Sequence, residues 1–161
     1  MLIGIIKNLD GSIGIVRPNQ DLLESITMAE IVDKANPGGL PSMIIDDAKL
    51  PADRVFRNAW EATASTVRIN RPRAEELHMR RLRFLRDIQL KYLDIELTIA
   101  QESQNTAEVS RIIELKQTLR DMPTTTDLST LTLTQLKSFK PVYLDGDIEA
   151  LQNKVPKATV E

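Results

Sequence analysis

The chain has 161 residues, with 21 basic and 23 acidic side chains and a formal net charge of −2. Hydrophobic residues make up 42% of it and charged residues 27%, which is typical of a globular protein and argues against wholesale disorder. The lack of cysteine excludes disulfides and cysteine nucleophiles, and a single histidine excludes any site that needs two imidazoles. No apolar run approaches the roughly 18 residues of a membrane span, and Lys7 follows the first apolar stretch, so we expect neither a transmembrane helix nor a secretory signal.

Charge divides the sequence into three segments: residues 1–67 have a net charge of −3, residues 68–91 of +5 and residues 92–161 of −4. A basic block between two acidic ones favours ion pairing within or between chains over nucleic-acid binding. Together with the patterns described next, this predicts an α+β protein. The expected parts are a small α+β unit over residues 1–67, a long helical hairpin over 68–122, and an irregular C-terminal segment with a tail over 123–161.

The first segment begins with two apolar runs, at residues 2–7 and 13–17, joined by the turn residues Asp10 and Gly11. Such a pair of runs predicts a β-hairpin. Thr27 and Glu30 have the spacing of a capping box and predict a short helix that ends at residues 36–39. Residues 41–47 are then expected to form a third strand, and residues 51–60 a turn that leads into a half-buried stretch.

The second segment carries the longest regular pattern. Asn70 is a good N-cap, and the sequence from Arg73 to about Gln104 contains neither glycine nor proline, which predicts one long helix. Spacings of 3, 4, 3 and 4 predict an apolar seam of the coiled-coil type at Leu85, Ile88, Tyr92, Ile95 and Ile99. The stripe is widened by Leu82, Leu93, Leu97 and Ala100.

A second helix is expected over residues 107–121, ended by Pro123, and the short connection predicts an antiparallel helical hairpin. The Arg-rich half of the first helix, residues 71–86, would extend beyond this hairpin and need another neighbour. In the third segment, Thr132 and Gln135 predict a short helix over residues 133–138. The expected remainder is an extended run at 142–144, a turn at 145–147, a short helix at 148–154 and a tail.

Four groups of residues have a functional and a structural interpretation. His78 lacks an evident catalytic partner, so we expect a surface or partly packed role. Phe56 and Trp60 suit either an interface anchor or a core, and the core is favoured because the N-terminal segment has no other aromatic residue. The acidic pairs Asp46–Asp47 and Asp145–Asp147 lack the regularly placed donors of a calcium loop, so turn chemistry is favoured.

The fourth group is an arginine block on the long helix, formed by Arg80, Arg81, Arg83 and Arg86. It suits either a phosphate backbone or an acidic protein surface, and the overall acidic balance favours the protein surface. The sequence shows no phosphate loop, nucleophile elbow or dinucleotide-binding motif, so we expect no enzymatic activity, cofactor or metal.

Two stretches resemble small phage-encoded proteins. Residues 44–61, Ile-Ile-Asp-Asp-Ala-Lys-Leu-Pro-Ala-Asp-Arg-Val-Phe-Arg-Asn-Ala-Trp-Glu, resemble a segment of proteins encoded near tail and tail-fibre genes. Residues 115–123, Leu-Lys-Gln-Thr-Leu-Arg-Asp-Met-Pro, are similar to the helix-ending run of phage tail assembly chaperones, and Pro141 after a short Leu-Lys helix fits the same pattern. The matches cover about 30 residues and imply no catalytic or ligand residues.

The resemblance implies a non-enzymatic virion component associated with the tail or tail fibres and assembled in the bacterial host cytoplasm. A first alternative is a tail or tail-fibre assembly chaperone that is not retained in the virion. A second, based on the arginine block, is a nucleic-acid-binding packaging or regulatory protein. The expected partners are other phage structural proteins, in an oligomer or a hetero-complex. The expected contact residues are Arg80, Arg81, Arg83, Arg86, Leu85, Ile88, Tyr92, Ile95 and Ile99.

Overall fold

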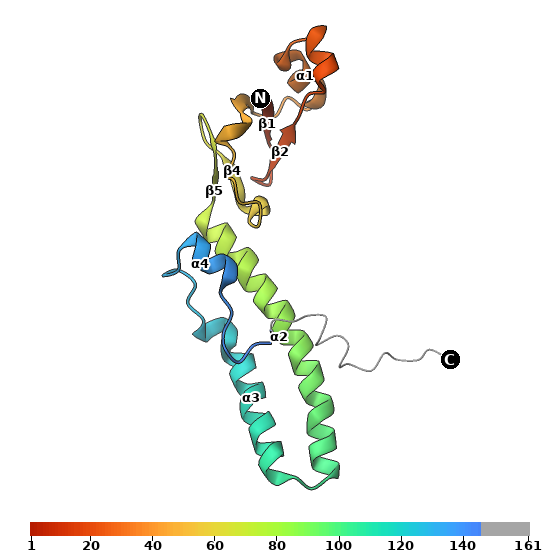
Figure 1. Ribbon diagram of the computed structural model, residues 1–161, viewed down its shortest axis with the longest axis vertical. Helices are drawn as coiled ribbons and strands as arrows, with labels where there is room; N and C mark the ends of the chain where they lie inside the picture. Colours follow the sequence, from red (N-terminus) through yellow and green to blue (C-terminus); the bar gives the residue numbers. More distant parts are fainter. Residues whose placement is uncertain (146–161) are drawn as a thin grey trace, which may run out of the picture. The chain divides into compact units, whose positions relative to one another are not determined.

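A computed structural model describes residues 1–145, and the contacts divide the chain into two compact units, Met1–Leu77 and His78–Glu161 (Figure 1). The strands lie in the first unit, and the second unit is built from helices and irregular segments as far as residue 145. The α+β prediction is therefore confirmed. Part of the turn expected at 145–147, the helix at 148–154 and the tail lie outside the described residues.

The first unit is built on a three-stranded antiparallel sheet with the order β2-β1-β3. Strand β1 (Leu2–Lys7) pairs with β2 (Ile13–Val16) and, along its other edge, with β3 (Ser42–Asp46). Gly11 in the β1–β2 turn has φ +78, a conformation that glycine adopts without strain. The predicted hairpin and third strand are confirmed.

The two faces of this sheet are covered by different elements, because side chains alternate along each strand. One face packs on α1 (Met28–Ala35), where the predicted capping box of Thr27 and Glu30 is present. The other face packs on a second hairpin, β4 (Trp60–Ala62) and β5 (Val67–Ile69). The core between this face and the hairpin consists of the buried side chains of Ile3, Ile5, Ile45, Trp60 and Val67.

The β4–β5 hairpin was not predicted from the sequence. Each strand has only three residues, which is too short for a visible alternation, and the pairing of Trp60 with Ile69 holds the two strands together. Three short 3-10 helices were also missed: η1 (Gln20–Glu24), η2 (Asp47–Lys49) and η3 (Arg57–Ala59). Phe56 and Trp60 are 4% and 2% exposed, so their predicted core role is confirmed.

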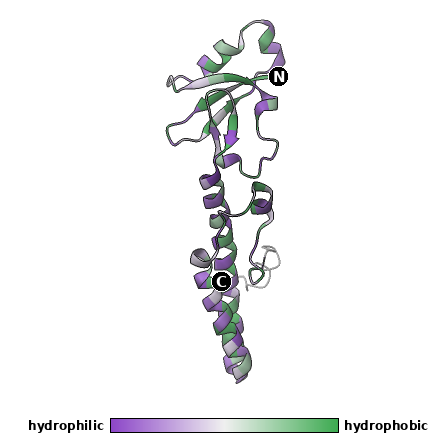
Figure 2. Ribbon diagram, turned by 90° about the vertical axis from the view of Figure 1, so that its left-hand side faces the viewer, coloured by the Kyte–Doolittle hydropathy of each residue, from purple (hydrophilic) through white to green (hydrophobic). Residues whose placement is uncertain are grey.

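Helix α2 (Arg71–Glu102) begins in the first unit and continues into the second. It is followed by α3 (Thr106–Thr125) and by the short helix α4 (Leu133–Ser138), whose predicted capping box is present. Polar and apolar residues alternate along α2 and α3, as Figure 2 shows. The loop between them is so short that the two helices form the predicted hairpin.

Two predicted boundaries were wrong. Helix α3 does not stop before Pro123 but runs on to Thr125. Proline removes one helical N–H, but here it lies in the last turn, where the hydroxyls of Thr124 and Thr125 donate to the carbonyl of Asp121 at 2.8 and 3.1 Å. The run at 142–144 is a turn rather than extended, because the Leu144 N–H donates to the Pro141 carbonyl at 3.0 Å.

Candidate interaction surface

Helix α2 carries all the residues that were predicted to bind a partner, and the structure divides its apolar residues into two stripes. The first stripe, which we call the internal seam, is buried within the second unit. Its buried members are Leu82, Leu85, Gln89, Leu93 and Ala100. They are spaced three or four residues apart, except that the half-buried Glu96 lies between Leu93 and Ala100.

The buried residues of α2 thus follow a different line along the helix from the predicted seam. Of its five residues, Leu85 alone is buried, at 3% exposure, and it is accordingly not available to a partner. The sequence pattern missed the internal seam because Gln89 interrupts it with a polar side chain. Residues that the pattern assigned to the margin, such as Leu82 and Leu93, lie in the core instead.

Gln89 is buried because its amide group is satisfied by the backbone of residues 139–145, a segment that we call the strap. Its Nε2 donates to the Tyr143 carbonyl at 3.1 Å, and its Oε1 accepts from the Asp145 N–H at 2.9 Å. Both hydrogen-bonding groups of the amide are thus paired, which removes most of the penalty of burying it. One side chain of α2 therefore fixes the end of the strap.

His78 fixes the other end of the strap, because its Nε2 bonds the Phe139 carbonyl at 2.9 Å. With a carbonyl as acceptor, Nε2 must carry the proton. Burial lowers the pKa of His78, and the positive charge of Arg81 lowers it further, while the bond to Phe139 opposes both effects. His78 is 5% exposed, so its role is a packed one. The chain itself thus supplies a neighbour for the Arg-rich part of α2 from His78 onward.

The second stripe of α2, which we call the open stripe, remains partly accessible in the second unit. Phe84 and Ile99 are 53% and 60% exposed. Ile88, Tyr92 and Ile95 lie between them and are half-buried. The open stripe therefore consists of Phe84, Ile88, Tyr92, Ile95 and Ile99, and it contains four of the five apolar residues that were predicted to bind a partner.

The four arginines do not form a single face, because successive residues of an α-helix are rotated by roughly 100°. Arg80, Arg81 and Arg83 are exposed, whereas Arg86 is half-buried and pairs with Asp87 at 2.7 Å. Within residues 1–145, neither Arg81 nor Arg83 forms an ion pair. These two guanidinium groups are the part of the arginine block that is available to an acidic partner.

Helix α3 contributes a largely buried lysine side chain that the sequence did not reveal. Lys116 lies between Ile112 and Leu119 on the buried face of α3, and its ammonium group pairs with the exposed carboxylate of Asp94 on α2. The lysine stem thus packs as an apolar group while its charge reaches the surface. In the sequence, a lysine at this position looks like a solvent-facing residue. The helical spacing of Ile112, Leu119 and Met122 was the one signal that position 116 lies on the buried face.

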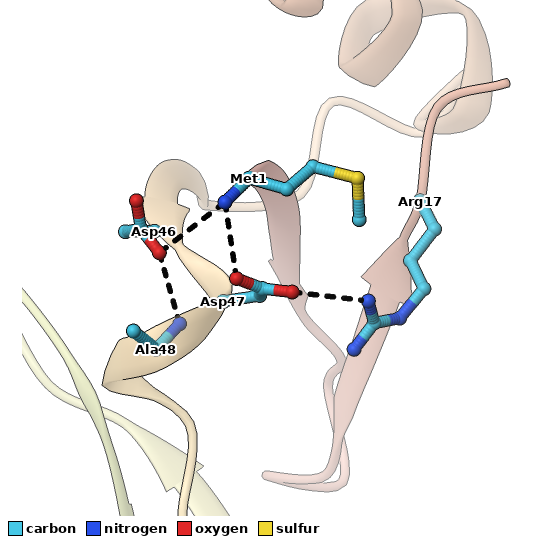
Figure 3. A network of polar contacts seen from close by, with 5 residues as sticks. All are labelled: Met1, Arg17, Asp46, Asp47 and Ala48. Atoms are coloured by element: carbon cyan, nitrogen blue, oxygen red, sulfur yellow. Dashed lines mark hydrogen bonds and ion pairs between the residues drawn. The ribbon is translucent and has the colours of Figure 1, made fainter. Parts of the chain in front are cut away.

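The acidic pair Asp46–Asp47 has structural partners in the first unit (Figure 3). Asp46 accepts from the Ala48 N–H at 3.0 Å and caps η2, as expected for turn chemistry. Asp47 pairs with the amino group of Met1 at 3.1 Å and with Arg17 at 3.5 Å. The hydrogen bond that the Ala48 N–H donates lowers the pKa of Asp46. The hydrogen bond that the Met1 amino group donates to Asp47 raises the pKa of that amino group.

Comparison of the chain with protein-family models, curated proteins and solved structures found no match. Among residues 1–145, no helix combines the length and the apolar character needed to cross a membrane. The same residues contain no group of three or more histidine, cysteine or acidic side chains placed to hold a metal ion. The surface of α2 and the resemblance of the two sequence stretches are therefore the features that indicate a function.

Proposed function

We propose that this protein acts by binding another protein along the open stripe of α2, as a non-enzymatic component of a phage tail or tail fibre. The observation that carries the proposal is the coexistence of two apolar stripes on one helix. The internal seam already supplies the contacts that hold the second unit together. The open stripe adds apolar area at Phe84 and Ile99 that residues 1–145 leave accessible.

The charge next to the open stripe indicates the chemistry of the partner. Arg81 lies one helical turn before Phe84 and Leu85, and neither Arg81 nor Arg83 has an ion-pair partner among residues 1–145. An apolar surface with a guanidinium group at one end suits a partner surface that combines apolar and acidic side chains. The proposed partner is therefore a protein with an apolar strip and carboxylates at one of its ends.

The phage assignment is supported by the resemblance of residues 44–61 and 115–123 to phage proteins. In the structure, the first stretch spans β3 and the turn before β4, and the second forms the end of α3. Neither stretch includes the open stripe. The mode of action and the biological setting of the proposal therefore have independent support, and each is tested separately.

The setting is tested by mass spectrometry of purified phage particles from a genome that encodes this chain. A virion component is expected in stoichiometric amounts with the tail proteins. Its absence from particles, combined with misassembled fibres when the gene is deleted, would instead identify an assembly chaperone. Binding to DNA that weakens steeply with salt, without binding to tail proteins, would favour the nucleic-acid alternative.

The mode of action is tested with Phe84→Glu and Ile99→Glu, which place charge on the open stripe. Both side chains are more than half exposed, so the fold is expected to tolerate the change while recruitment into particles falls at least tenfold. Leu9→Glu is the matched control, because Leu9 is 95% exposed in the first unit and does not belong to the stripe. Equal recruitment of the stripe variants and the control would refute the assigned surface.

A further inference from the structure

The first unit contains a cavity of about 250 Å³ whose lining combines an apolar floor with three arginines. The apolar part is formed by Ile15, Leu50 and Trp60, and the basic part by Arg17, Arg54 and Arg57. Among the residues that the structure describes, no acidic side chain lines the cavity, although residues 1–67 carry more acidic than basic residues. Because the three guanidinium groups are exposed, solvent screens their mutual repulsion, and their shared positive charge attracts an anion.

Arg17, Arg54 and Arg57 are exposed, and one backbone turn brings two of them to the cavity. Arg54 and Arg57 lie at the two ends of one turn, which is closed by the Arg57 N–H donating to the Arg54 carbonyl at 3.0 Å. Phe56, within this turn, is 4% exposed and anchors it in the unit. Arg17 lies one residue beyond the end of β2, and it lines the cavity together with Ile15 of that strand.

The charges around the cavity are only partly neutralised by the protein. Arg17 pairs with Asp47 at 3.5 Å, and Asp47 in turn contacts the Met1 amino group (Figure 3). Among residues 1–145, Arg54 and Arg57 have no ion-pair partner. Two guanidinium groups therefore remain for a ligand. Their two positive charges match the two negative charges of a phosphate monoester better than the single charge of a carboxylate.

The apolar part of the cavity lining includes Trp60, whose fluorescence can report the binding of a ligand. Within the described part of the chain, the indole Nε1 of Trp60 is the one buried side-chain nitrogen or oxygen without a hydrogen-bond partner. Trp60 is also the only tryptophan in the sequence. The apolar side chains beside the arginines would contact the organic part of a ligand, and a cavity of about 250 Å³ has room for a small group.

We propose that Arg17, Arg54 and Arg57 form a binding site for a phosphate monoester carried on a small apolar group, with Trp60 and Leu50 against the apolar part. The site is independent of the proposed protein contact on α2, since all of its residues belong to the first unit. Arg54 and Arg57 supply charge-assisted hydrogen bonds to the phosphate oxygens. Arg17 contributes a weaker contact because it is shared with Asp47.

The proposal is tested on the full-length protein by titration with phenyl phosphate while the fluorescence of Trp60 is recorded. A saturable change is expected with phenyl phosphate, and binding should be at least tenfold weaker for inorganic phosphate, phenylacetate and benzyl alcohol. If inorganic phosphate bound as tightly as phenyl phosphate, or more tightly, the proposed apolar contact would be refuted. The same result with phenylacetate would refute the preference for two charges, and with benzyl alcohol it would refute the need for an anion. The lack of a saturable change with phenyl phosphate would refute it entirely.

The double variant Arg54→Gln/Arg57→Gln should bind phenyl phosphate at least tenfold more weakly than the unmodified protein. Arg81→Gln/Arg83→Gln removes the same number of charges from the second unit and should bind as the unmodified protein does. Equal affinity of the two double variants would overturn the site. As a second measurement that needs no variant, raising the salt concentration should weaken binding to the unmodified protein, and a salt-independent affinity would also overturn it.

Discussion

Replacing Gly4 with alanine tests how closely α1 packs on the sheet of the first unit. A Cβ atom at position 4 would lie 2.3 Å from Cγ2 of Val32 and 3.3 Å from Cβ of Val16. Ordinary contacts begin at 3.4 Å, so the helix must move by about 1 Å to admit the methyl group. Inserting a methyl group into a well-packed core typically destabilises by about 1–3 kcal/mol.

An opposing effect makes the sign of the change informative. Alanine is less flexible than glycine in the unfolded chain, and in a strand with free space it would stabilise by about 0.5–1 kcal/mol. The first contact is far inside the ordinary distance, so we expect the packing penalty to dominate. Gly4→Ala should then lower the free energy of unfolding by about 2 kcal/mol.

Val32→Ala removes the atom that the new methyl group would meet. Alone, it should destabilise by about 2 kcal/mol, because Val32 is 3% exposed and loses two buried methyl groups. In the Val32→Ala background, however, Gly4→Ala should become neutral or stabilising by about 0.5 kcal/mol. The double variant is therefore expected to be more stable than Val32→Ala alone, or at least equally stable.

The assay is urea unfolding of the four proteins of this double-mutant cycle, followed by the fluorescence of Trp60, which lies in the same unit. A coupling energy of about 2–3 kcal/mol is expected between the two substitutions. If the effects of the substitutions added within about 0.5 kcal/mol, the proposed contact between position 4 and Val32 would be refuted.

Three further predictions concern the second unit. Leu93→Ala should destabilise by about 2–5 kcal/mol and Ile99→Ala by less than about 0.5 kcal/mol in urea unfolding followed by circular dichroism; the reverse order would show that the two stripes of α2 have been exchanged. Gln89→Ala should cost about 1–3 kcal/mol, because it leaves two backbone groups of the strap unpaired, and an unchanged unfolding midpoint would contradict the bonds described. Burial lowers the pKa of His78, so below its ordinary value of 6.5 the unfolded chain binds more protons than the folded chain. Stability should therefore be fully present above pH 6.5 and decrease as the pH falls through it; His78→Gln, which keeps a donor without titrating, should lose this dependence, and an identical pH profile for the variant would exclude His78 as its source.

Local signals in the sequence predicted the elements whose stabilising contacts are close along the chain. The capping boxes at Thr27 and Thr132 each involve residues three positions apart, and the turn at Gly11 depends on one backbone conformation. These features are present in the structure because they do not require knowledge of any distant neighbour. The short hairpin β4–β5 was missed, since it depends on packing against the sheet rather than on its own pattern.

Periodicity in the sequence was sufficient to identify α2 as a long helix with more apolar surface than one contact needs. It was insufficient to tell which stripe is buried, because a buried Gln89 looks like a solvent-facing residue until the strap is in place. The partners of His78 and Gln89 lie 61 and 54 residues away along the chain. The sequence by itself thus determined the long helix and its wide apolar surface, whereas tertiary contacts with the strap decided which part of that surface became the core and which part stayed accessible. The same holds for the arginine-lined cavity: the turn that carries Arg54 and Arg57 is local, but only the fold brings Arg17 to it.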